Sequence, residues 1–133
     1  MKKLIAVLVA LSVVIVLTAA SCGGSGGTGN GTGNGNGNDV HMGNTTFTQP
    51  SVTIRKGSNV NLIDDVAVLH IISNGSWVNG VGTPTTEPGA PTVSNLQFNT
   101  AGQSMNIGPF NTAGTYHIYC SVHLNMNLTV IVQ

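Results

Sequence analysis

Gly114–Met126 reads GTYHIYCSVHLNM, and it places Cys120 three residues before His123 and six residues before Met126. The stretch therefore brings a thiol, an imidazole and a thioether onto one short segment. Neither packing nor turn formation requires this combination of side chains. Soft sulfur donors beside an imidazole are typical of a site for a copper ion that changes its charge by one. The stretch therefore predicts part of a copper site and the strand that carries it.

The first half of this stretch has the alternation of a β-strand. Tyr116, Ile118 and Cys120 share one face, whereas His117 and Tyr119 point to the other face. We therefore expect Cys120 to end a strand with its side chain inward, and the other two donors to follow on the loop beyond. The same parity predicts that His117 lies on the surface.

A trigonal copper site needs a second imidazole, and the chain offers three further histidines. His117 faces away from Cys120, and His41 lies among polar residues at the start of the domain. His70 lies inside the apolar run VAVLHII, residues 66–72, where a buried imidazole without a partner would be costly. A core histidine with an ordinary hydrogen-bond partner is the alternative, but the incomplete donor set favours His70 as a metal ligand.

The chain has two cysteines, Cys22 and Cys120. If Cys22 is modified, Cys120 is alone, and a lone thiol in an oxidising compartment is a liability unless something such as a metal occupies it. The alternatives are a buried, inert cysteine and a disulfide between Cys22 and Cys120. The histidine and methionine that follow Cys120 favour the metal site over both alternatives.

Residues 39–133 have the pattern of a single all-β domain. No segment keeps a helical period, and short apolar alternations are separated by turns that contain Gly, Pro or Asn. Short strands at this spacing predict an antiparallel β-sandwich of about seven or eight strands. Ser73–Pro91 is rich in glycine, proline and threonine, and it reads as a long loop. The expected strands are 51–56, 59–63, 66–72, 105–107, 115–120 and 127–132.

Residues 1–22 have the pattern of an export signal. Two lysines precede an uncharged run of 17 residues, Leu4–Ala20, which ends in small side chains. The run Ala19-Ala20-Ser21 followed by Cys22 resembles a bacterial lipoprotein signal, in which the cysteine receives lipid after cleavage. Ordinary cleavage nearby and an uncleaved anchor are the alternatives. All three place the rest of the chain outside the cytoplasm, and a lipidated Cys22 at the cell membrane is the favoured arrangement.

Residues 23–38, GGSGGTGNGTGNGNGN, carry neither an apolar nor a charged side chain. Such a segment cannot bury surface to offset its ordering entropy, so we expect a flexible tether between anchor and domain. Beyond residue 22 the chain carries two basic and four acidic residues, and hence a net charge of −2. The absence of a basic patch argues against nucleic acid as a partner.

The domain resembles the cupredoxins, the blue-copper family that includes plastocyanin and amicyanin. The resemblance rests on MGNTTFTQPSVTIRKGSNV at 42–60, on the apolar strand with His70, and on FNTAGTYHIYCSVHLNM at 110–126. Within the last of these, the Cys-x-x-His-x-x-Met spacing is the short ligand loop of amicyanin. The family implies a Greek-key β-sandwich that holds one copper ion through His70, Cys120 and His123, with Met126 as a weak axial ligand.

The resemblance also implies a function. Cupredoxins of this type carry single electrons between redox proteins of the membrane or periplasm, with cytochromes or oxidases as the expected class of partner. A site buried among Ile and Val side chains leaves no open position for a substrate, so we do not expect an enzyme. His123 lies between Val122 and Leu124, which predicts an imidazole edge at an apolar docking surface. We expect the domain to be a monomer.

Three positions depart from the family pattern. Plastocyanin has asparagine directly after the first histidine ligand, where it helps tie the two ligand segments together; this chain has Ile71 there. Amicyanin has prolines around its second histidine, where this chain has Val122 and Leu124, and Leu128 stands where glycine often follows the methionine. No ligand is lost, but any such tie must come from elsewhere.

Other function classes make different demands on the sequence. A copper carrier or storage protein that delivers the ion often uses exposed Met and His clusters, and His41, Met42 and Met105 are few for that role. A multicopper oxidase fragment would need His-x-His pairs, and an oxidase subunit with a two-copper centre would need two cysteines in the loop; the sequence has neither. A metal-free adhesion sandwich would make the donor set a coincidence.

Overall fold

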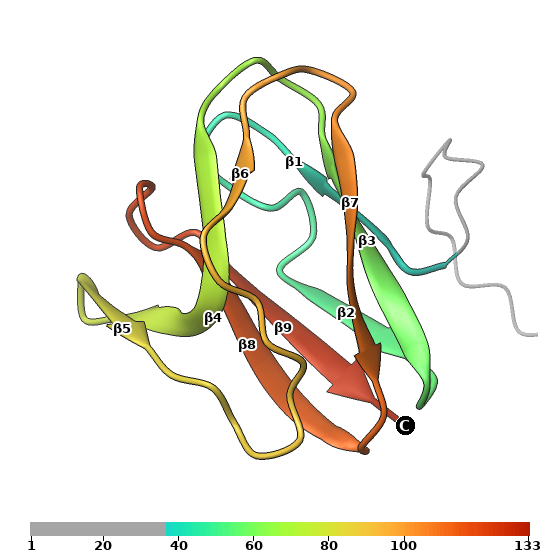
Figure 1. The fold of residues 1–133 in the computed structure, drawn as a ribbon. Helices are drawn as coiled ribbons and strands as arrows, with labels where there is room; N and C mark the ends of the chain where they lie inside the picture. Colours follow the sequence, from blue (N-terminus) through green and yellow to red (C-terminus); the bar gives the residue numbers. More distant parts are fainter. Residues whose placement is uncertain (1–36) are drawn as a thin grey trace, which may run out of the picture. The chain divides into compact units, whose positions relative to one another are not determined.

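The computed structural model describes residues 37–133, drawn in colour in Figure 1. The predicted export signal, Cys22 and the predicted linker up to residue 36 lie outside the described residues. Within the described part all regular structure is β, which confirms the predicted class. None of its residues forms a helix long and apolar enough to cross a membrane. The strands are β1 (Asp39–Met42), β2 (Ser51–Ile54), β3 (Ser58–Asp64), β4 (His70–Val78), β5 (Val81–Pro84), β6 (Leu96–Phe98), β7 (Ser104–Phe110), β8 (Gly114–Cys120) and β9 (Asn127–Val132).

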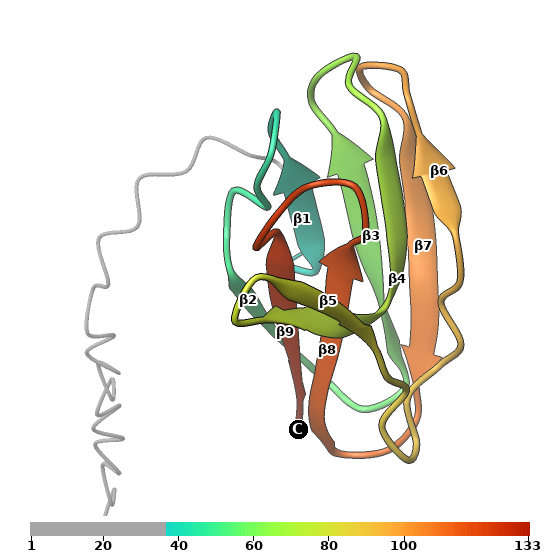
Figure 2. The same ribbon diagram turned by 90° about the vertical axis from the view of Figure 1, so that its left-hand side faces the viewer.

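Two sheets face each other across a shared core, as Figures 1 and 2 show from perpendicular directions. The smaller sheet has the order β1-β3-β7. The larger sheet has the order β2-β9-β8-β4-β5, and β6 pairs with β4 beside this path. This arrangement confirms the predicted β-sandwich.

The strand directions differ from the expected purely antiparallel arrangement. β1 runs parallel to β3, and β2 runs parallel to β9, while the remaining pairs are antiparallel. Both parallel pairs involve short strands from the start of the domain that lie beside strands distant in sequence. Hydrophobic alternation marks a strand and its buried face but carries no information about direction, so the sequence pattern could not reveal these pairs.

The core forms from alternating positions of the strands. Strand β9 shows this clearly, because its even positions Leu128, Val130 and Val132 are buried and the positions between them are partly exposed. The same alternation holds in β1 and β2. The domain therefore has its own hydrophobic core, which is the property that lets a domain fold by itself. Its largest fully buried apolar side chains are Tyr116, Phe98, Phe110, Met42, Leu62, Ile72, Ile118, Met126 and Leu128.

The prediction of a long loop at Ser73–Pro91 is wrong for the first half of this range. Strand β4 continues to Val78 and turns back into β5, which makes a projecting hairpin (Figure 1). Gly75 has a φ of 128°, and a Cβ at this position would lie 2.3 Å from the carbonyl oxygen of Thr83. Only glycine fits here, so the residue that looked like a loop signal is the point where one long strand changes partners.

The expected strand at 66–72 begins later than predicted. Residues 66–69 are irregular, and β4 starts at His70. Its side chain shares the inward face with Ile72, two residues on, and Ile72 lies opposite Cys120 on β8. The pairing of these two central strands therefore brings His70 and Cys120 to the same end of the larger sheet.

Candidate metal centre

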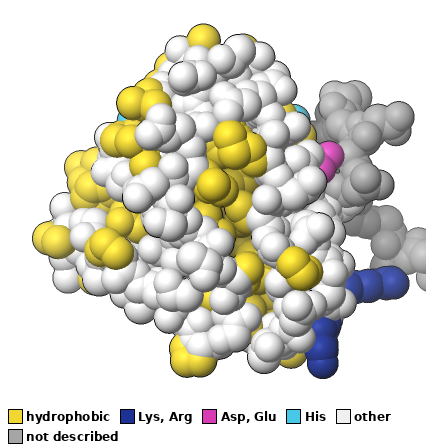
Figure 3. Space-filling view, viewed as in Figure 1, with side chains coloured by type: hydrophobic (Ala, Val, Ile, Leu, Met, Phe, Trp, Pro, Cys, Tyr) yellow, Lys and Arg dark blue, Asp and Glu magenta, His cyan; other side chains and the backbone are white. Residues whose placement is uncertain are grey.

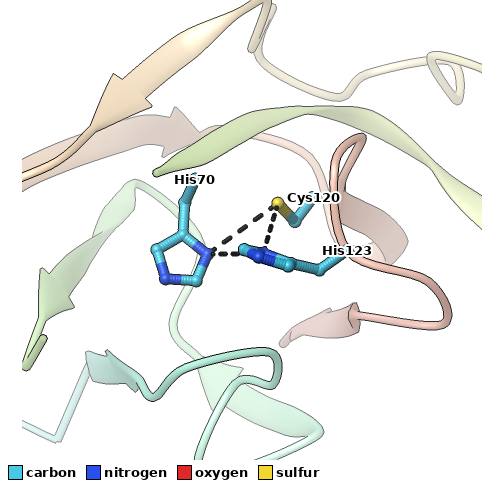
Figure 4. A group of neighbouring side chains, drawn as sticks. All are labelled: His70, Cys120 and His123. Atoms are coloured by element: carbon cyan, nitrogen blue, oxygen red, sulfur yellow. Dashed lines mark hydrogen bonds between the residues drawn. The ribbon is translucent and has the colours of Figure 1, made fainter. Parts of the chain in front are cut away.

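Three donor atoms converge where β4 begins and β8 ends (Figure 4). The Cys120 Sγ lies 3.8 Å from the Nδ1 of His70 and 3.5 Å from the Nδ1 of His123. The two Nδ1 atoms lie 3.2 Å apart, and the two imidazole rings meet edge to face. Each donor is thus within reach of one small common centre.

The three groups differ in their access to solvent. His70 and Cys120 are fully buried, whereas His123 is partly buried on the loop between β8 and β9. Cys120 carries a free thiol. The structure therefore brings together the three residues that the sequence singles out, and their role as metal ligands stays a prediction.

Met126 closes the same loop. Its carbonyl oxygen accepts the backbone N–H of Cys120 at 3.0 Å, and its own N–H donates to the carbonyl of His123 at 3.2 Å. Its side chain is 1% exposed. These bonds fold the Cys-x-x-His-x-x-Met segment into a compact turn with the thioether turned inward. Met126 as the axial ligand stays a prediction.

The two segments that carry the predicted ligands are tied together, although Ile71 stands where plastocyanin has asparagine. The backbone N–H of Ser121 donates to the carbonyl oxygen of Ile71 at 2.8 Å, and the Ser121 hydroxyl donates to the same oxygen at 3.4 Å. Each of these residues directly follows a predicted metal ligand. A backbone hydrogen bond thus connects the two ligand segments, for which the sequence alone indicated no residue.

Trp77 gives the site a second support that sequence reasoning missed. Its indole N–H donates to the carbonyl oxygen of Cys120 at 2.8 Å. The side chain of Asn127 accepts from the backbone N–H of Trp77 at 2.8 Å and donates to its carbonyl at 3.2 Å. The indole also meets Tyr119 edge to face, and Tyr119 is buried although its strand parity suggested an outward position. The β4–β5 hairpin therefore braces the cysteine from outside the core.

The remaining histidines do not join the donor cluster. The Nδ1 of His41 lies 2.7 Å from a carboxylate oxygen of Asp65, and the Nδ1 of His117 lies 2.6 Å from a carboxylate oxygen of Glu87. Their side chains are 41% and 43% exposed. Both histidines lie at the surface, as their position and parity predicted; their pairing with acids was not predicted.

His70 is held in its neutral, metal-competent form by its surroundings. Burial lowers the pKa of its imidazole below the ordinary value, and nearby Asp64 opposes this shift. The neighbouring His123 lowers the pKa further, and the backbone of Gly43 raises it. Since burial is the largest cause, the ring is neutral at neutral pH, which is the state that a metal ligand requires.

The donor set suits copper on chemical grounds. Two imidazole nitrogens and one thiol sulfur match the trigonal His₂Cys arrangement of electron-transfer copper sites. Structural zinc sites have four ligands, and catalytic zinc sites use three with an open position. Here His70, Cys120 and Met126 are all buried. The set therefore supports one copper ion for each chain.

Comparison with known proteins identifies the fold. No protein-family model matches the chain, and no curated protein sequence matches it. Among solved structures, amicyanin from Paracoccus versutus aligns with a TM-score of 0.54 at 24% identity, over 71% of this chain and 79% of that chain. A reduced tryptophan-to-tyrosine variant of amicyanin aligns with a TM-score of 0.53 at 20% identity, over 71% and 80% of the two chains. A methionine-to-alanine variant in the Cu(I) form has the same score and coverage at 19% identity. At these identities the likeness shows a shared fold.

Proposed function

We propose, from the cupredoxin fold of residues 39–133, that this chain holds one copper ion and carries single electrons between redox proteins. The observation that carries the proposal is the convergence of His70 Nδ1, Cys120 Sγ and His123 Nδ1 within 4.8 Å of one another. His70 and the other two residues come from segments about fifty positions apart. Packing alone does not require such a meeting of one thiol and two imidazoles.

The donors suit both oxidation states of copper. Cu(I) prefers soft sulfur ligands, Cu(II) accepts imidazole, and a weak axial thioether from Met126 tunes the potential without adding charge. A bound copper ion would supply a one-electron couple at a fixed site. The protein's part is to hold the donors still, so that little rearranges when the electron moves.

Rigidity around the cluster supports this role. The ligand loop is fixed by three hydrogen bonds: the Ser121–Ile71 backbone bond, the Cys120–Met126 backbone bond and the indole bond from Trp77. The burial of His70, Cys120 and Met126 supports a site without access for a substrate. We therefore infer an electron carrier and not an enzyme.

An apolar surface next to His123 fits the docking of a partner. Leu124 is 62% exposed, and Leu69 and Val122 are each close to half exposed. Figure 3 shows hydrophobic side chains on the side where the β8–β9 loop and the β4–β5 hairpin project and also along the middle of this face, while the Lys and Arg side chains lie at the lower right. A redox protein that docks here would face the one partly exposed ligand edge.

The remainder of the proposal concerns place and partners. The lipoprotein-like signal and the Gly/Asn-rich run support a domain tethered by Cys22 to the outer side of the cell membrane. A monomer on such a tether could meet an electron donor and an acceptor in turn, and a cytochrome or an oxidase is the partner class we infer. Mass spectrometry of the mature protein should show a diacylglycerol on Cys22; an unmodified Cys22 retained in the chain contradicts the anchor.

Copper titration of the purified protein tests the function. Added Cu(II) should produce an intense thiolate-to-copper absorption band, and Cys120→Ser should abolish it. A colourless protein, with or without tightly bound copper, would refute a blue-copper site. Whether the protein keeps its copper distinguishes the alternative of a copper carrier. An electron carrier cycles between oxidised and reduced states with its copper in place, whereas a carrier of the ion releases it to a chelator or partner.

A further inference from the structure

Two buried polar atoms behind His70 lack a hydrogen bond. By hydrogen-bond geometry, the Nε2 of His70 and the Oδ2 of Asp64 have no partner within bonding distance among residues 37–133, although the backbone of Gly43 lies near enough to His70 to raise its pKa. Both side chains are 0% exposed. Buried polar groups are almost always paired, because an unpaired one carries its full desolvation cost. Hydrophobic packing does not explain why the buried imidazole of His70 and the buried carboxylate of Asp64 lie together.

The two side chains face each other. The Oδ1 of Asp64 lies 3.7 Å from the Nε2 of His70, slightly beyond hydrogen-bond length and too close for an intervening group. The same Oδ1 accepts the backbone N–H of Val66 at 3.3 Å. The carboxylate is therefore aimed at the ring nitrogen that points away from the donor cluster.

Asp64 is fixed where it lies. Its backbone N–H donates to the carbonyl of Gln103 at 2.8 Å, and its carbonyl accepts the N–H of Gly102 at 2.6 Å. It ends β3 opposite Met42 of β1. The carboxylate therefore belongs to the smaller sheet, and it reaches across the core to a ligand that belongs to the larger one.

The position matters because the two ring nitrogens of His70 have different tasks. Nδ1 faces Cys120 and His123, so it must be free of a proton to bind a metal. The proton must then reside on Nε2, and an acceptor behind Nε2 selects that tautomer and increases the basicity of Nδ1. A carboxylate is the strongest such acceptor among side chains.

A buried negative charge also favours one oxidation state. Reduction of Cu(II) to Cu(I) removes one positive charge from the site. A fixed anion close to the ligand stabilises the more positive oxidised form over the reduced form, and it does so strongly where water is excluded. The charge on Asp64 should therefore lower the reduction potential.

We propose that Asp64 is a positioning residue for His70: it holds the proton on Nε2, presents Nδ1 to the metal, and lowers the reduction potential of the bound copper. The potential part rests on the proposed copper function. The tautomer part concerns the metal-free protein and stands apart from it.

A pair of charge-removing variants tests the proposal in the full chain. Asp64→Asn keeps an oxygen acceptor of similar shape but removes the charge, and Asp65→Asn removes the same charge from the adjacent residue, whose side chain is 44% exposed. We expect Asp64→Asn to weaken Cu(II) binding at least tenfold relative to Cu(I). For a one-electron couple this raises the potential by about 59 mV or more. Asp65→Asn should shift it far less.

Nitrogen NMR of the metal-free wild-type chain provides a test that needs neither copper nor a variant. The proton of His70 should reside on Nε2. A proton on Nδ1 would overturn the proposal, and so would an unchanged potential in Asp64→Asn or an equal shift in both variants. If wild-type protein forms no blue-copper site, the proposed function fails, and the NMR result still decides the role of Asp64.

Discussion

At the scale of single residues, the site depends on donor atoms that an apolar side chain of the same size and shape would lack. Cys120 and His70 are both fully buried, yet the Cys120 Sγ and the His70 Nδ1, two atoms that can bind a metal, lie 3.8 Å apart. A Val or Leu side chain of similar size would fill the core equally well and would carry no metal-binding atom. Burial combined with converging donors is therefore what separates a metal site from ordinary packing.

Met126→Leu tests the predicted axial ligand. Leucine has a similar volume, so the core should lose less than about 1.5 kcal/mol of unfolding free energy. The thioether donor is lost, which removes a ligand that stabilises Cu(II) and should raise the reduction potential while the thiolate absorption band remains. Voltammetry and the visible spectrum measure both effects. An unchanged potential would show that the Met126 sulfur does not contact the metal.

Trp77→Phe tests the indole bond to Cys120. The variant keeps an aromatic ring in the hairpin but leaves the Cys120 carbonyl without its donor, so unfolding free energy should fall by about 1–3 kcal/mol. Tyr119→Phe is the matched control, because it keeps both rings in contact. Denaturant unfolding measures the difference. A loss in Trp77→Phe no larger than that in Tyr119→Phe would contradict a stabilising role for the indole bond.

At the scale of elements, the sequence predicted most of the strands but missed β1, β5 and β6. The alternation of β2, β3, β8 and β9 gave their approximate positions, and the donor spacing identified the ligand loop. β5 was missed because the glycine, proline and threonine residues of this stretch are typical of loops. The pairing of the hairpin depends on backbone conformation, which residue type alone does not reveal. Asp64 was missed as a partner of His70 because the contact joins two sheets, and no local pattern reports a contact of that kind.

Gly75→Ala tests the point at which β4 changes partners. The added Cβ would meet backbone atoms of the partner strand, and the φ of 128° disfavours any side chain. We expect a loss of about 3 kcal/mol or more in unfolding free energy. Gly80→Ala is the control, since Gly80 also has a positive φ, 78°, but open space around its Cβ position. Its cost should be about 1–2 kcal/mol, from conformation alone.

At the scale of the whole molecule, the predicted metal would act as a cross-link. His70 lies at the start of β4 and the other donors lie on and after β8, so one ion would join two central strands of the larger sheet at their common end. Copper binds these donors together only in the folded chain. Binding and folding are therefore thermodynamically linked.

Thermal or denaturant unfolding with and without copper measures this linkage. Free copper at about one hundred times its dissociation constant should add about 2.7 kcal/mol to the unfolding free energy. A chelator should reverse the gain, and Cys120→Ser should show little of it. Equal stabilisation of wild type and Cys120→Ser would place the bound copper elsewhere on the protein.

The complete burial of the Cys120 sulfur has a further consequence for the lifetime of the empty protein. Thiols age by oxidation to sulfenic and higher acids or by exchange with other sulfur compounds, and both reactions require access to the sulfur atom. With no exposed surface, Cys120 reacts only when the domain opens locally. The folded domain therefore protects this sulfur from oxidation until a metal binds, and refolding could not reverse such damage.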